Sequence, residues 1–228
     1  MHFLVMVVGP HVERQLALYG EQTRLAPYRA YVPAAEIAAT QRYYREHPKE
    51  GLDPDDVAAH IRRDVGDLLG PDGVGRDERG WYYWSTENWK ARWDYWTLSD
   101  REPWSLLLRS DRLHAAQALL GDIDLDAMRH RALAAAEREW DEWEASSRDR
   151  RNAVLSIQAE GFTRVQFLMR STWRPTALVI DGLWHERGDR GLRADVSDQR
   201  AAEWNRFVDE QFARLPADTL ITCVDCHH

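Results

Sequence analysis

A β-hairpin is the feature of this sequence that most constrains its fold. Residues 176–180 form a short run rich in aliphatic residues, Asp181-Gly182 follows, and a second short apolar run begins at Leu183. An Asp-Gly pair between two apolar runs is a strong local signal for a two-residue turn that joins antiparallel strands. The sequence therefore predicts a sheet that is at least partly antiparallel.

Helical segments separate this hairpin from the other predicted strands. Capping residues and apolar spacing predict helices over residues 33–47, 53–69, 124–160 and 198–215, and strands over residues 3–9, 81–86, 104–108 and 219–227. This mixture predicts an α+β fold, an antiparallel or mixed sheet with helices packed on one side, with a ferredoxin-like core and one long central helix. Because no long Gly, Ser or Pro-rich linker interrupts the chain, we expect a single domain over residues 1–228.

The charge and hydropathy patterns limit the classes of partner. The net charge is -8, which disfavours binding of duplex nucleic acid through a broad basic face. No apolar run approaches the roughly 20 residues of a membrane helix, and the first apolar stretch is broken by Gly9-Pro10. The sequence therefore predicts a cytoplasmic protein without a membrane partner, and it leaves the oligomeric state open.

Tryptophan is concentrated in one segment: six of the 11 tryptophans fall between Trp81 and Trp104. The polar residues between these rings include Asn88, Lys90, Arg92, Asp94 and Arg101. Aromatic faces interleaved with arginine are typical of sites that stack a planar ring and hold an anionic group. The segment therefore predicts a binding site for a small anionic or planar ligand such as a nucleotide. The alternative is a strand whose rings fill the core while its charges face water.

A second candidate site involves the carboxyl end of the chain. Asp225 and His227 are two residues apart on a predicted strand and therefore share a face. His185 would supply a second imidazole if its strand lies alongside. Two histidines and a carboxylate are a known ligand set for a divalent metal, so this set would suit a metal-dependent hydrolase. The alternative is that these side chains are only solvated or hydrogen-bonded.

The two cysteines lie close together near the end of the chain. Cys223, Cys226 and His227 match the C-x-x-C-H pattern of covalent haem attachment. On a strand, however, residues three apart point to opposite faces and are about 10 Å apart. We therefore expect two reduced thiols, one packed on each side of the sheet.

The tryptophan segment also carries a family resemblance. Asn88, Arg92-Trp93-Asp94 and Arg101 resemble an Asn-Pro-x-x-Lys-Trp-Asp-Trp-Tyr-x-x-Gly-Gly-Arg-Trp signature in uncharacterised proteins of actinobacteria and their phages. The opening of the chain, the start of the long predicted helix, the hairpin and the closing residues look similar as well. Here Trp89 stands in the place of the family's Pro, and Ser99-Asp100 in the place of its Gly-Gly.

The resemblance implies a set of site residues but no activity. The residues that would bind the ligand are Asn88, Arg92, Trp93, Asp94 and Arg101. The family's Val-Asp-Cys-His ending favours Asp225 and His227 as residues of a site. Because phages carry members, the resemblance also implies, by analogy, a phage- or defence-related role. A structural or partner-binding protein is the remaining alternative, and catalysis stays an open question.

Overall fold

The structure is a computed structural model that describes residues 2–48, 53–66, 73–110, 112–145, 163–170, 173–188 and 198–228. The chain divides into two compact units, where the sequence predicted one domain. Unit 1 comprises Met1–Leu18 and Trp93–His228, and unit 2 is the inserted segment Tyr19–Arg92. The backbone amide of Arg92 donates a hydrogen bond of 2.7 Å to the carbonyl of Tyr19, so the two ends of the insert meet. Because no linker composition marks these ends, the sequence does not reveal the division.

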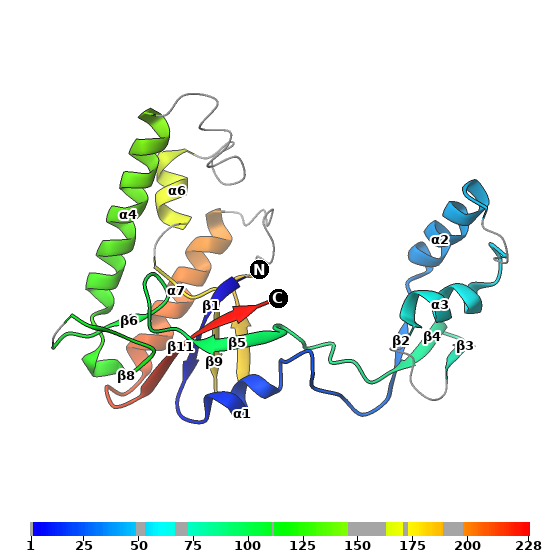
Figure 1. Cartoon of the computed structure of the whole chain (residues 1–228), viewed down its shortest axis with the longest axis horizontal. Helices are drawn as coiled ribbons and strands as arrows, with labels where there is room; N and C mark the ends of the chain where they lie inside the picture. Colours follow the sequence, from blue (N-terminus) through cyan, green and yellow to red (C-terminus); the bar gives the residue numbers. More distant parts are fainter. Residues whose placement is uncertain are drawn as a thin grey trace. The chain divides into compact units, whose positions relative to one another are not determined.

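Unit 1 is built on one mixed sheet with helices (Figure 1). Its elements are β1 His2–Val8, α1 Val12–Ala17, β5 Tyr95–Leu98, β6 Leu106–Leu107, β7 His114–Ala115, β8 Gln117–Leu119, η2 Leu120–Asp122, α4 Leu125–Ala145, α6 Arg164–Arg170, β9 Ala177–Ile180, β10 Leu183–Glu186, α7 Asp198–Arg214 and β11 Leu220–His227. The strand order is β10-β9-β1-β11-β5, and β8 also pairs with β11. The fold is therefore α+β, as predicted.

The predicted hairpin is present as β9 and β10, which pair antiparallel with Leu183 opposite Ile180. Both turn residues have positive φ, 51° at Asp181 and 74° at Gly182. These angles match the turn that suits the twist of a hairpin, in which Asp and Gly are the favoured residues.

The order of elements β1, α4, β9, β10, α7 and β11 is the β-α-β-β-α-β order of a ferredoxin-like core. The strand arrangement differs from that core. β1 and β9 are hydrogen-bonded parallel neighbours, with Val5 opposite Ala177, whereas a split βαβ unit has another strand between its parallel pair. The closing strand β11 lies on the other side of β1, with His2 opposite His227, as in a ferredoxin-like sheet.

Each face of the sheet has its own apolar core. On one face Met6 and Leu178 pack with Trp204, Val208 and Phe212 of α7 and with other residues of this cluster. These three α7 residues are spaced by four, so one stripe of the helix is buried as predicted. On the other face, Val12 and Leu16 of the short helix α1 pack against β1, β9 and β11. Helices therefore cover both faces of the sheet, whereas the sequence predicted helices on one face only.

The long helix α4 begins at Leu125, one residue after its predicted start, and continues to Ala145. The predicted continuation over residues 146–160 lies outside the described residues. Trp140 is buried and packs against Phe167 of α6, with ring centroids 5.4 Å apart, and Trp143 packs against the same small cluster. These two tryptophans serve a helix–helix contact within the chain.

The two cysteines are free and buried on opposite faces of β11, as predicted. Cys223 belongs to the core beneath α4 and α7, and Cys226 belongs to the core beneath α1. Two thiols that point away from each other cannot form a disulfide or jointly attach a haem.

Unit 2 is a three-stranded antiparallel sheet with two helices. Its elements are β2 Tyr28–Tyr31, α2 Ala34–Glu46, α3 Val57–Val65, β3 Val74–Asp77 and β4 Gly80–Ser85, in the strand order β2-β4-β3. The N-cap of α3 is Asp56, whose side chain accepts a hydrogen bond of 3.0 Å from the amide of Ala59. The sequence predicted that this helix begins at Asp53, whose side chain instead accepts a hydrogen bond from the amide of Asp55 before the helix.

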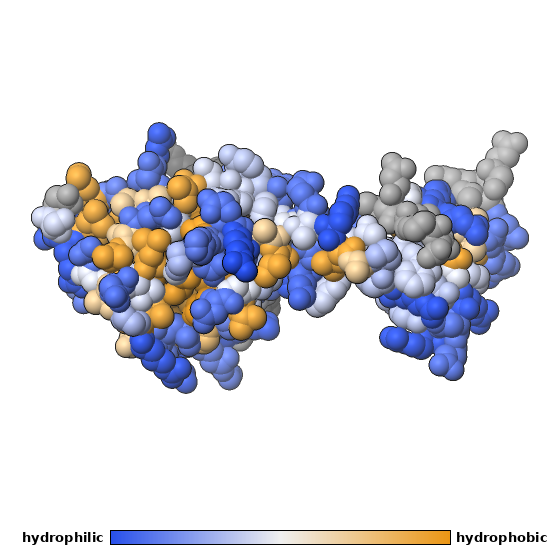
Figure 2. Space-filling view, turned by 90° about the horizontal axis from the view of Figure 1, so that it is seen from below, coloured by the Kyte–Doolittle hydropathy of each residue, from blue (hydrophilic) through white to orange (hydrophobic). Residues whose placement is uncertain are grey.

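The surfaces of the two units differ in character. In Figure 2 the visible face of unit 1 carries hydrophobic residues among hydrophilic ones, while the visible face of unit 2 is mainly hydrophilic. Scattered exposed hydrophobic residues are ordinary on a folded protein. Among the described residues, no helix combines the length and the apolar composition that are needed to cross a membrane.

Candidate functional site

The tryptophan segment is divided between the two units. Trp81, Tyr82 and Trp84 lie on β4 in unit 2, whereas the segment from Trp93 onward belongs to unit 1. The residues of the predicted site over 81–104 therefore belong to both units.

One face of the unit 2 sheet collects aromatic and arginine side chains, and we call it the aromatic–arginine face. It consists of Arg29, Tyr31, Asp77, Arg79, Tyr82 and Trp84. The alternation of strand residues places these side chains together, because Arg29 lies opposite Trp84 and Tyr31 lies opposite Tyr82. The ring centroids of Tyr31 and Tyr82 are 5.7 Å apart, and those of Tyr82 and Trp84 are 6.4 Å apart.

Two guanidinium groups lie against these rings. The Arg29 guanidinium carbon is 4.6 Å from the centroid of Tyr82 and 5.4 Å from that of Trp84. The guanidinium carbon of Arg79 is 4.2 Å from the centroid of Tyr31. Such cation–π contacts keep the positive charges at the ring surfaces, where a planar ligand with an anionic group would meet both.

Asp77 holds this arrangement in place. Its Oδ2 accepts hydrogen bonds of 3.0 Å from Arg29 and 2.8 Å from the hydroxyl of Tyr31, and its Oδ1 accepts one of 2.9 Å from the amide of Arg79. Burial acts to raise the pKa of Asp77, but these hydrogen bonds and the charge of Arg29 outweigh it, so the pKa lies below its ordinary value. Asp77 is therefore a stable anion that orients Arg29 and Tyr31.

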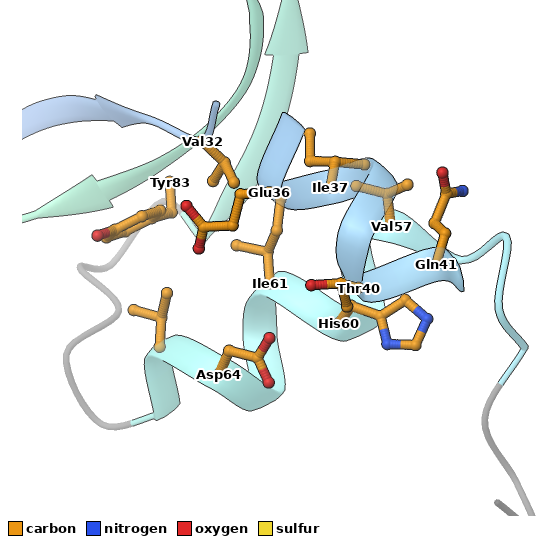
Figure 3. Close-up of a pocket in the computed structure, with 11 residues that line it drawn as sticks. Val32, Glu36, Ile37, Thr40, Gln41, Val57, His60, Ile61, Asp64 and Tyr83 are labelled. Atoms are coloured by element: carbon orange, nitrogen blue, oxygen red, sulfur yellow. The ribbon is translucent and has the colours of Figure 1, made fainter. Parts of the chain in front are cut away.

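The opposite face of this sheet carries the helices and a cavity of about 240 Å³ (Figure 3). Glu36 from α2, His60 and Asp64 from α3 and Tyr83 from β4 are among its lining residues. Burial raises the pKa of Tyr83, and the charge of Glu87 contributes, so Tyr83 remains a neutral phenol. With two carboxylates in its wall, this cavity is unsuited to an anionic ligand.

Asn88 and Arg92, two of the predicted ligand residues, are engaged within unit 2. Asn88 is 6% exposed, and its amide donates a hydrogen bond of 3.0 Å to the carbonyl of Gly20 while its oxygen accepts one from the amide of Lys90. Arg92 donates a hydrogen bond of 2.9 Å from Nη1 to the carbonyl of Ala91. The contacts of Asn88 join the two ends of the insert.

Trp93 and Arg101, also predicted to bind the ligand, lie in unit 1. The indole of Trp93 donates a hydrogen bond of 3.2 Å to the carbonyl of Leu16 and packs on the core beneath α1. The side chain of Arg101 is 94% exposed and lies 3.9 Å from Asp100. Trp93 is therefore a partly buried residue that packs against the core, and Arg101 is a solvated charge.

Asp94, the remaining predicted ligand residue, pairs with His227 from the predicted metal set. Nδ1 of His227 lies 2.9 Å from Oδ1 of Asp94, and the amide of Asp94 donates a hydrogen bond of 3.0 Å to the carbonyl of His227. The hydrogen bond from His227 is the main cause that lowers the pKa of Asp94, against the opposing effect of burial. The pair connects the start of β5 to the end of β11.

Asp225 pairs with a histidine that the sequence did not suggest. Its carboxylate lies 3.0 Å from Nδ1 of His2, the first described residue of the chain. The rings of His2 and His227 meet edge to face with centroids 5.1 Å apart, and the ring of Trp104 stacks on His2 at 6.4 Å. Asp225 and His227 do share a face, yet each points to a different partner.

The structure does not bring His185 to this cluster. His185 lies on β10, three strand spacings or about 14 Å from β11, and its ring packs on Phe207 with centroids 5.1 Å apart. Within the described parts of the chain no group of three His, Cys, Asp or Glu side chains is arranged to hold a metal ion. The predicted set of His185, Asp225 and His227 is therefore not assembled, because the hairpin joins β1 on the side away from β11.

The sequence also missed the contribution of β2 to the aromatic–arginine face. The sequence predicted no helix or strand between residues 9 and 33, whereas Tyr28–Tyr31 forms a strand that pairs with β4. The alternation of Arg29 and Tyr31 with Tyr28 and Ala30 was a local signal for this strand. Comparison of the chain with protein-family models, with curated proteins and with solved structures finds no match.

Proposed function

We propose that this protein binds a small planar anionic ligand, of the mononucleotide type, on the aromatic–arginine face of unit 2. The observation that carries the proposal is the placement of Arg29 and Arg79 directly over three neighbouring rings, with Asp77 as their anchor. Guanidinium groups stack on planar rings and grip phosphate, so one surface offers both interactions.

The neighbouring alternatives have less support. The opposite cavity of unit 2 carries carboxylates, and Asn88 and Trp93 are occupied with contacts that hold the chain together. The metal-dependent hydrolase lacks its ligand set, since His185 is three strands from His227. A ligand-binding surface on unit 2 therefore has the strongest support.

The proposal is tested by the melting temperature and by titration calorimetry with AMP, adenosine and ribose 5-phosphate. We expect AMP to raise the melting temperature most, because adenosine lacks the phosphate and ribose 5-phosphate lacks the planar ring. Absence of any shift with AMP and with the other purine and pyrimidine mononucleotides would favour a structural or partner-binding protein instead.

Matched variants locate the site. Trp84→Ala and Arg29→Gln should weaken AMP binding, with a loss of about 1–3 kcal/mol for the stacking residue. The control variants are Trp89→Ala, which removes a ring that is 64% exposed and follows β4, and Arg62→Gln on α3, which removes an exposed charge. If the control variants lose AMP binding while Trp84→Ala retains it, the site is not on this face.

A further inference from the structure

A serine, a histidine and a glutamate lie in contact with one another in unit 1. Oγ of Ser105 lies 2.7 Å from Nδ1 of His114, and Nε2 of His114 lies 3.1 Å from Oε1 of Glu102. Arg131 of α4 adds a hydrogen bond of 3.0 Å to the same Glu102 oxygen.

The backbone explains why these groups meet. Ser105 immediately precedes β6 and His114 begins β7, and these two strands pair with Leu107 opposite His114. Glu102 lies three residues before Ser105, and Arg131 reaches it from α4. Ser105 is 3% exposed, so its hydroxyl is withdrawn from bulk water.

The three groups line a cavity of about 350 Å³. Ser105, His114 and Glu102 share its wall with apolar residues that include Met128 and Trp173. Arg138, two turns beyond Arg131 on α4, also lines the cavity. A cavity of this volume holds a small molecule, and its wall offers an apolar part and a cationic part.

Two groups lie beside Nε2 of His114: Oε1 of Glu102 at 3.1 Å and Nη1 of Arg131 at 3.5 Å. In the tautomer with its proton on Nε2, that proton faces the Glu102 carboxylate, which can only accept. Nδ1 then carries the lone pair and accepts the hydrogen bond from the hydroxyl of Ser105. This is the hydrogen-bond logic of a nucleophile, a general base and an orienting carboxylate, with the two imidazole nitrogens exchanged relative to the usual serine triad.

We propose that this cavity is a serine esterase site for a small carboxylic ester, with Ser105 as the nucleophile and His114 as the general base. Oγ of Ser105 attacks the ester carbonyl carbon while its proton passes to Nδ1 of His114. The bond from the carbonyl carbon to the alcohol oxygen breaks, and the departing alcohol takes that proton. Water then attacks the acyl-enzyme and gives a proton to His114, which returns it to Ser105 as the carboxylic acid is released, and the acid loses its remaining proton to solvent.

In this reaction Glu102 is a positioning residue, since its carboxylate lies 3.1 Å from Nε2 and favours the tautomer that leaves Nδ1 free to accept a proton. Arg131 holds Glu102 in turn. The site lies in unit 1 and is independent of ligand binding on the aromatic–arginine face.

The test uses the full chain and an alkyl fluorophosphonate, which bonds covalently to activated serines and releases fluoride. We expect one phosphonyl group per chain by intact mass, located on Ser105 by peptide mapping. Ser105→Ala should remove the label, and His114→Gln should slow labelling at least ~100-fold. Ser110→Ala, at an exposed serine in the same region, should label like the wild type.

Two further results separate a role in the reaction from a role in folding. Glu102→Gln should slow labelling strongly, whereas Glu102→Asp, which keeps a carboxylate, should restore part of the rate at an unchanged melting temperature. p-Nitrophenyl acetate should be hydrolysed by the wild type faster than by Ser105→Ala. A wild type that melts cooperatively yet takes up no label on Ser105, or a Ser105→Ala variant that labels equally fast, would overturn the proposal.

Discussion

The hydroxyl of Tyr82 lies 2.6 Å from the position that a Cβ atom on Gly75 would occupy, and its Cζ lies 2.7 Å from it. Gly75 is directly opposite Tyr82 in the pairing of β3 with β4. The Tyr82 ring therefore lies across the β3 backbone because residue 75 has no side chain. This close approach keeps Tyr82 within reach of Arg29.

Gly75→Ala should displace the Tyr82 ring, because contacts below 3 Å cannot be accommodated without a shift. We expect AMP binding to weaken while unit 2 remains folded, with a loss of stability of about 1–3 kcal/mol. Heteronuclear NMR of the Tyr82 ring and titration calorimetry check this. As a control, Gly121→Ala, in unit 1, should leave AMP binding unchanged; equal binding by Gly75→Ala would contradict the role of Tyr82.

The pair of Asp94 and His227 should make stability depend on pH in the acidic range. Because the folded pKa of Asp94 is lowered, its contribution is present above the unfolded pKa of about 3.9 and is lost as pH falls through the folded pKa. Urea unfolding between pH 7 and pH 3 should show wild type more stable than Asp94→Asn at pH 5–7, with the difference closing toward pH 3. Asp100→Asn, at an exposed carboxylate, should show no such trend.

The thiols of Cys223 and Cys226 should not react with thiol reagents in the folded protein. Burial raises the pKa of Cys223 and of Cys226 well above the ordinary value, and both have a relative exposure of 0%. We expect no reaction with a disulfide reagent such as dithionitrobenzoate in the native state and two equivalents of thiol in guanidinium chloride. A thiol that reacts quickly in the native protein would contradict their placement in the two cores.

Asp209 connects two arginines from different parts of unit 1. It accepts hydrogen bonds of 3.0 Å from Arg174 and 2.6 Å from Arg129, and the Arg174 side chain is only 10% exposed. Asp209→Ala should cost about 2 kcal/mol, because it leaves a buried guanidinium without its carboxylate. Glu210→Ala, which removes an exposed partner of Arg214 at 3.6 Å, should cost less than about 0.5 kcal/mol by the same urea titration.

The elements that the sequence predicted well are those with a strong local signal. Asp181-Gly182 predicts its own turn, and the spacing of Trp204, Val208 and Phe212 predicts the buried stripe of α7. No local signal reports which strands become neighbours, and for that reason the predicted approach of His185 to Asp225 was wrong.

The candidate sites depend even more on contacts between distant residues. Tyr82 and Trp84 lie in the predicted aromatic segment, but their partner Arg29 comes from a strand more than 50 residues earlier. Ser105, His114 and Glu102 form no known sequence motif, and only the pairing of β6 with β7 reveals their contact. The pairing of strands therefore determines which residues meet in the aromatic–arginine face and in the cavity beside Ser105.

The hydrogen bond between Arg92 and Tyr19 closes the inserted segment at its base. A segment whose two ends meet can be gained, lost or replaced in a lineage by one recombination event, since the host sheet needs only a short bridge in its place. The aromatic–arginine face therefore lies on a segment that one short bridge can replace, while the cavity beside Ser105 lies in the unit that would remain.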